Sequence, residues 1–144
     1  MAYLLTYDGY MREGYLEEIC PSAILFMQCG LKDCALEFRR FYETAMPTLE
    51  VGDEIVPAVI WKIEETDLKN MELVYPSEIY EREVWNFRTE KNVLEVTVFL
   101  MKETPFAFPK ENEVEAMEEA YAEHSFDYSC VENALDRAKD REGE

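Results

Sequence analysis

Near its N-terminus the chain reads Tyr3-Leu4-Leu5-Thr6-Tyr7-Asp8-Gly9-Tyr10, and this stretch decides the fold of its N-terminal part. An apolar strand runs through a tight turn into an amphipathic helix over Met11 to Ile19, which ends before Pro21 because the residue preceding a proline avoids the helical region. Such a turn directs backbone N–H groups at the helix N-terminus, an arrangement that favours a carboxylate or a phosphate. We therefore expect a ligand site here, although Asp8 and Tyr10 are poor residues for holding a small anion.

The composition is typical of one globular domain with a hydrophobic core. The chain has 144 residues, of which 48% are hydrophobic. No window approaches the roughly 20 apolar residues that cross a bilayer, so we expect no membrane partner. No basic segment followed by an apolar stretch and a cleavage site opens the sequence, which predicts a cytoplasmic location. We predict a single domain over residues 1–139 and a frayed acidic tail over 140–144.

The charge is strongly acidic, with 32 acids, 14 bases and a formal net charge of -18. This field repels nucleic acid and anionic lipid surfaces, so neither is an expected partner. The acids between Glu111 and Glu123 form either a solvated helix face or a docking surface for a basic protein. The four cysteines contain no Cys-x-x-Cys pair and the chain has one histidine, so the sequence implies no metal site and no other cofactor.

Apolar periodicity places the remaining elements. Alternating or continuous apolar runs predict strands over 23–29, 34–40, 55–63, 80–87 and 93–101, the last two forming a hairpin. Helical spacing predicts helices over 66–75, 114–121 and 131–138. Counting the N-terminal elements, about six strands and four helices occur without regular alternation, which favours an α+β fold: a small mixed β-barrel or a curved sheet, with flanking helices and a helical C-terminus.

Several short strings, spread over nearly the whole chain, carry a resemblance to a known family. Besides the first strand and turn they are Cys20-Pro21-Ser22-Ala23, Pro57-Ala58-Val59-Ile60-Trp61-Lys62-Ile63, Glu65-Thr66-Asp67, Tyr80-Glu81-Arg82-Glu83 and Ala120-Tyr121-Ala122-Glu123-His124. In this order and spacing the chain resembles the gamma-glutamylcyclotransferase family, including its AIG2-like members. The resemblance implies a fold with a small mixed barrel or curved sheet.

The resemblance also implies a reaction. In the family, a Tyr-Gly-Ser-Asn loop holds the γ-glutamyl group, and a glutamate after the mid-chain helix acts as acid and base. The α-amine of the substrate attacks its own γ-carbonyl, which expels an amine or amino acid and leaves 5-oxoproline. Because the amine arrives protonated, the reaction needs a base, and a positioned one is worth typically about 10²–10⁴ in rate.

The present sequence departs from the family at both places. Tyr7 matches the tyrosine of the loop, whereas Asp8, Gly9 and Tyr10 replace its glycine, serine and asparagine. Asp8 brings a carboxylate to the place where the family binds one, and like charges repel.

The position of the family's glutamate falls on Tyr75. A phenol with an ordinary pKa near 10 is protonated at neutral pH and cannot act as that base. Glu72 and Glu78 are the acids that could substitute for it.

Three functions remain open from the sequence. The first is a cyclotransferase-like protein that has lost its activity and keeps a pocket for a γ-glutamyl compound or for an altered, cationic or aromatic-friendly ligand. The second is an active cyclotransferase, and the third is an acidic protein-interaction module. The sequence predicts no particular oligomeric state. The ligand-binding residues we expect are Tyr7, Asp8, Gly9, Tyr10, Tyr75 and Tyr80, although these tyrosines could equally be packing residues.

Overall fold

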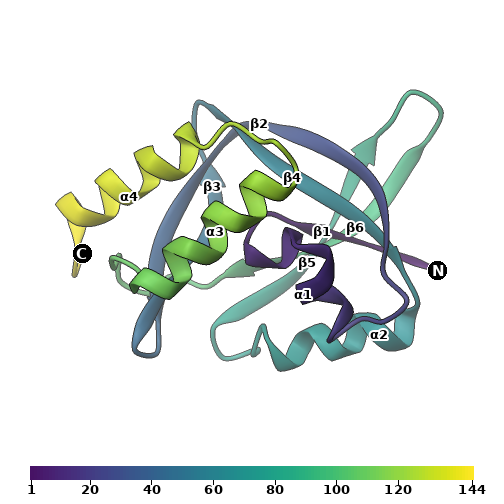
Figure 1. The fold of residues 1–144 in the computed structure, drawn as a ribbon, viewed down its shortest axis with the longest axis horizontal. Coiled ribbons are helices and arrows are strands. Elements are labelled where there is room, and N and C mark those ends of the chain that lie inside the picture. Colours follow the sequence, from purple (N-terminus) through teal and green to yellow (C-terminus); the bar gives the residue numbers. More distant parts are fainter.

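The computed structural model describes residues 1–144 and contains one six-stranded sheet (Figure 1). Its strand order is β3-β2-β4-β1-β6-β5. Neighbouring strands are antiparallel except β1 and β6, which pair in parallel at Leu4 and Thr97. The strands are β1 Ala2–Thr6, β2 Ile24–Phe41, β3 Thr44–Val51, β4 Glu54–Ile63, β5 Tyr80–Arg88 and β6 Val93–Met101. The mixed sheet curls into a half-barrel, which confirms the predicted α+β fold.

The curvature comes mainly from β2, which bends over the other strands together with β4 (Figure 1). Two register shifts interrupt the pairing of β2 with β4, one between Leu25 and Met27 and one between Leu31 and Cys34. Irregularities of this kind bend a strand and increase its twist. The curl brings β3 near β6, where the Met101 N–H donates to Thr48 Oγ1 at 3.0 Å.

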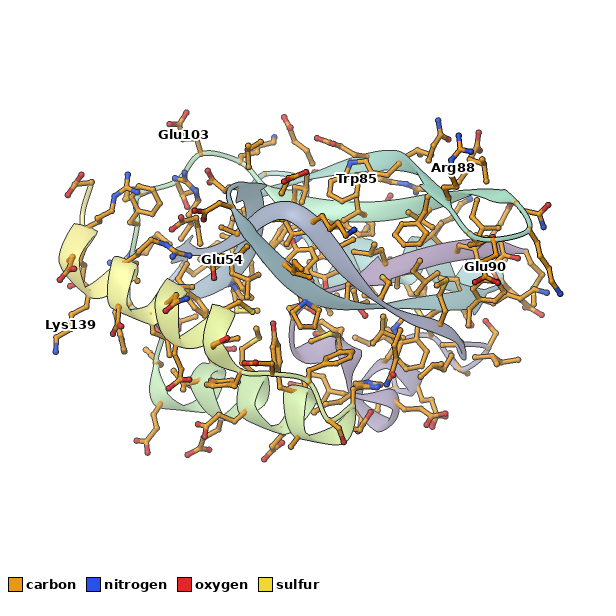
Figure 2. The ribbon with its side chains drawn as sticks, turned by 90° about the horizontal axis from the view of Figure 1, so that it is seen from above. Glu54, Trp85, Arg88, Glu90, Glu103 and Lys139 are labelled. Carbon is orange, nitrogen blue, oxygen red and sulfur yellow. The ribbon has the colours of Figure 1, made fainter.

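Two of the α-helices have five and six residues, and the other two have 13 residues each. They are the 3-10 turn η1 Gly9–Met11, α1 Glu13–Glu17, α2 Glu65–Asn70, the 3-10 turn η2 Met71–Leu73, α3 Glu111–Glu123 and α4 Ser129–Arg141. Arg137 ties α4 to the sheet, donating to Leu36 O at 2.8 Å and to Glu54 at 3.1 Å; Figure 2 shows Glu54 on the side of the sheet that faces this helix. No helix has both the length and the apolar character needed to span a membrane.

The core lies between the inner face of the sheet and the helices. β4 is central in the strand order, and its Val59, Ile60 and Trp61 are fully buried. The indole N–H of Trp61 donates to Thr6 Oγ1 at 2.8 Å, which satisfies a buried donor and fixes the end of β1. This end of β1 leads directly into the loop where the sequence predicts a site.

Two strands differ from the sequence prediction. The strands expected over 23–29 and 34–40 are one continuous strand, β2, and the strand β3 was missed. Pro47 lies within β3 opposite Phe38, and a proline normally argues against a strand. It is tolerated here because β3 is at the edge of the sheet.

Two helices also differ from the prediction. The helix expected over Met11 to Ile19 is reduced to η1 and α1, and Tyr15, expected on its buried face, is 46% exposed. The mid-chain helix begins at Glu65, before the expected cap Thr66, and its last turn is a 3-10 turn.

The C-terminal residues, for which the sequence predicts a frayed tail, make backbone contacts. Helix α4 continues to Arg141. The N–H of Gly143 donates to Phe106 O at 2.8 Å, and the N–H of Phe106 donates to Glu144 O at 3.0 Å. The guanidinium of Arg141 also lies 3.9 Å from the centre of the Phe106 ring.

Candidate functional site

In the loop after β1, the carboxylate of Asp8 occupies the position where the sequence suggests that an anionic ligand could bind. Asp8 precedes η1, and its Oδ1 accepts the Tyr10 N–H at 3.0 Å. The side chain of a capping aspartate commonly accepts such a free N–H at a helix start. Because Asp8 is only 1% exposed, the backbone donor that the strand-helix turn presents is bound to this carboxylate inside the protein.

Tyr75 completes the environment of Asp8 from the opposite side. It follows η2, and its phenol O–H donates to Asp8 Oδ2 at 2.6 Å. The ring of Tyr75 is stacked on Phe99 of β6, with centroids 4.9 Å apart and an interplanar angle of 21°. Asp8 and Tyr75, two of the ligand-binding residues expected from the sequence, are thus in direct contact, although 67 residues separate them.

Burial dominates the electrostatics of this pair. It raises the pKa of the Asp8 carboxyl, while the hydrogen bonds from Tyr75 and from the Tyr10 backbone oppose the rise. Burial, together with the neighbouring Asp8, also holds the pKa of Tyr75 well above its ordinary value. The Tyr75 phenol is therefore a hydrogen-bond donor at neutral pH and does not accept protons.

The other predicted tyrosines surround the pair. The Tyr7 O–H donates to Phe99 O at 2.5 Å, and the ring of Tyr10 lies 5.8 Å from that of Tyr75. Tyr80 is 3% exposed, and its ring lies 4.8 Å from Tyr75, but its hydroxyl has no hydrogen-bond partner. The structure brings these residues together as one cluster, in which Tyr7, Tyr75 and Tyr80 are buried and Tyr10 is half-buried.

Glu72 and Glu78 make their polar contacts outside this cluster. The Glu72 side chain is 61% exposed, and its carboxylate lies 3.8 Å from the Arg82 guanidinium. Glu78 is exposed and accepts a hydrogen bond from Tyr42 at 2.8 Å. Both border a hollow of about 600 Å³ that also reaches Tyr75 and Tyr80. Neither carboxylate forms a hydrogen bond with Asp8 or Tyr75.

A separate cavity of about 300 Å³ lies beside the loop. It is bounded by η1 and α1, by the end of β2 and by β3, by the end of η2 and by α3. Its lining comprises Gly9, Tyr10, Tyr15, Phe41, Met46, Pro47, Leu73, Val74, Glu113, Ala116 and Met117. Of the residues expected at the site, Gly9 and Tyr10 line this cavity.

Sequence reasoning missed Phe41, Met46 and Glu113. Phe41 ends β2 and Met46 lies in the unpredicted β3, while Glu113 lies in the first turn of α3. The acids of α3 are similar in sequence, and nothing local distinguishes Glu113 from its exposed neighbour Glu115. Only the packing of α3 against η1 turns Glu113 toward the cavity.

The Asp8 environment predicts a pH dependence of stability. A carboxyl whose pKa is raised by folding contributes stability below its ordinary pKa and loses that contribution as pH rises through the raised value. We therefore expect the wild-type protein to lose stability relative to Asp8→Asn as the pH rises above about 4, the ordinary pKa of this carboxyl. Urea denaturation of both proteins at a series of pH values measures the difference. A constant difference would contradict the effect.

The comparisons with known proteins bear on the fold. No family model matches the sequence, and no curated protein matches it. Among solved structures, the chain is similar to a gamma-glutamyl cyclotransferase, with a TM-score of 0.73, 15% identity and coverage of 99% of this chain and 89% of that one. An uncharacterized protein from Homo sapiens gives the same values.

A third similar structure is YkqA from Bacillus subtilis, with a TM-score of 0.70 and 13% identity. The match covers 96% of this chain and 54% of YkqA. At 13–15% identity, these similarities support a shared fold and say nothing about the residues of the site. The half-barrel described above is the fold of gamma-glutamyl cyclotransferase.

Proposed function

We propose that this protein is a gamma-glutamylcyclotransferase-like protein without cyclotransferase activity, which binds a small molecule in the cavity beside its first strand–helix loop. The observation that carries the proposal is the buried hydrogen bond from Tyr75 to Asp8. It joins the two positions that the resemblance assigns to the catalytic glutamate and to the substrate-binding loop.

The chemistry of this pair opposes the cyclisation. The reaction requires a group that removes a proton from the substrate ammonium, and Tyr75 is a phenol whose pKa is held well above its ordinary value. Asp8 is the carboxylate nearest to this position, but both of its oxygens already accept hydrogen bonds inside the protein. A γ-glutamyl substrate would also bring its own carboxylate toward Asp8, against charge repulsion.

The cavity itself supports retention of a binding function. Its volume of about 300 Å³ lies at the lower end of the range for small-molecule pockets, and eight of its eleven lining residues are hydrophobic. The lining combines this apolar surface with few polar groups, as ligand sites usually do.

An assay of 5-oxoproline release tests the loss of activity. We expect the purified protein to release no 5-oxoproline above the uncatalysed rate from a panel of γ-glutamyl amines and γ-glutamyl dipeptides, measured by mass spectrometry. An active gamma-glutamyl cyclotransferase in the same assay is the positive control. Release above the uncatalysed rate would overturn the proposal, and its disappearance in Asp8→Asn would assign the base to Asp8.

A further inference from the structure

The cavity beside the loop holds one charged side chain, Glu113 of α3. Glu113 is half-buried, and no Lys, Arg or His side chain forms an ion pair with it. Lys110, one turn earlier, lies instead 3.8 Å from Glu43. Burial raises the pKa of the Glu113 carboxyl, against the opposing effect of Lys110. The cavity therefore contains a partly desolvated carboxylate that forms no ion pair within the protein.

Aromatic rings form much of the remaining wall. Tyr10, Tyr15 and Phe41 line the cavity, and the centroids of the two tyrosine rings lie 5.2 Å apart. The Arg12 guanidinium carbon lies 4.0 Å from the centroid of the Tyr15 ring, so the protein's own cation covers one face of this ring and a ligand can use only the rest of it. Rings of this kind attract cations through their electron-rich faces, and the attraction grows when water is excluded.

The rest of the lining is apolar and includes no basic residue. Met46 and Pro47 of β3 contribute to it together with Leu73 and Val74 of the η2 segment. An anionic ligand would find no positive partner there and would meet the carboxylate of Glu113. A cation with a short apolar body would satisfy both the carboxylate and the apolar wall.

We infer that this cavity binds a small organic cation, an ammonium group on an apolar or aromatic body, with the ammonium placed against Glu113 and the aromatic rings. The inference rests on the proposed binding function and names its ligand class. Glu113 acts as the counter-ion, and the apolar lining holds the body of the ligand.

Calorimetric titration of the full chain with two matched probes tests the ligand class. The probes are 2-phenylethylamine, which is charged at neutral pH, and the uncharged 2-phenylethanol. We expect the amine to bind about tenfold more tightly than the alcohol, since a charge-assisted contact supplies the difference. Glu113→Gln keeps the shape of the side chain and should remove this preference.

Glu115→Gln is the matched control, because it removes the same charge from an exposed position of the same helix. It should leave the binding of the amine unchanged. Tyr15→Leu removes an aromatic ring from the cavity wall and should lower the affinity for the amine several-fold. Because Tyr15 is 46% exposed, this variant should still fold. Thermal denaturation of each variant confirms that it is folded.

Two results would overturn the inference. If both probes bind equally and Glu113→Gln changes neither, the ligand is not a cation, while the proposed binding function stands. If neither probe binds, the cavity does not take this class of ligand. Release of 5-oxoproline in the separate assay would overturn the proposed function itself, so the two failures are distinguishable.

Discussion

Replacement of Tyr75 by phenylalanine is expected to lower the free energy of unfolding by about 1–3 kcal/mol, because it leaves the buried Asp8 carboxyl without its O–H donor. The substitution keeps the ring that stacks on Phe99, so little packing is lost. The remaining donor to Asp8 is the Tyr10 N–H. Urea denaturation monitored by tryptophan fluorescence measures the change. The loss should grow as the pH rises and Asp8 ionises, since a charged carboxylate forms the stronger hydrogen bond with the phenol.

Tyr80→Phe is the matched control for this variant. Tyr80 is as deeply buried as Tyr75 and packs against it, but its hydroxyl has no hydrogen-bond partner. Removal of an unsatisfied buried hydroxyl is expected to leave stability within about 0.5 kcal/mol of the wild type or to raise it slightly. Equal losses in the two variants would show that the hydrogen bond from Tyr75 to Asp8 contributes no stability of its own.

The second large effect is a gain of activity. Substitution of Asp8→Gly, Gly9→Ser and Tyr10→Asn together with Tyr75→Glu should produce measurable 5-oxoproline release from a γ-glutamyl amine. A positioned general base is worth about 10²–10⁴ in rate. The four substitutions supply this base and the loop of the family that the sequence resembles. A Cβ at position 9 would lie 3.4 Å from that of Ala116, an ordinary contact, so the serine is tolerated.

The substitution at position 75 must be combined with removal of Asp8, because two carboxylates would otherwise lie side by side. A glutamate at position 75 beside the native Asp8 would place two carboxylates in a buried site, where like charges destabilise each other. Tyr75→Glu alone should therefore lower stability without giving activity, and the three loop substitutions alone should remain inactive. A folded fourfold variant without 5-oxoproline release would mean that residues elsewhere in the cavity also prevent the reaction.

Much of the fold follows from local patterns in the sequence. The apolar runs around Val59 to Trp61 and the hairpin over 80–101 predict their strands correctly, because burial of a strand leaves a direct trace in residue order. The strand containing Pro47 left no such trace. Its existence depends on an edge position in the sheet, which is a property of the assembled structure.

For the site, too, some residues can be predicted from the sequence and others are found only in the structure. The contiguous loop Tyr7, Asp8, Gly9 and Tyr10 is visible in the sequence, and the resemblance adds Tyr75 and Tyr80. Neither source predicts that Glu113 borders the cavity, or that Glu72 and Glu78 contact Arg82 and Tyr42. These facts depend on the direction of each side chain after the helices have packed.

The sequence by itself determined the chemical groups available to the site: an acid at Asp8 in the first strand–helix loop and a phenol at Tyr75 after the mid-chain helix. Residue order reports the periodicity of single elements and the identity of each group. The tertiary structure decided that these two groups hydrogen-bond to each other and that a carboxylate from α3 borders the adjacent cavity. The reason is that contacts between distant segments are set by sheet register and helix packing, which depend on the whole chain at once.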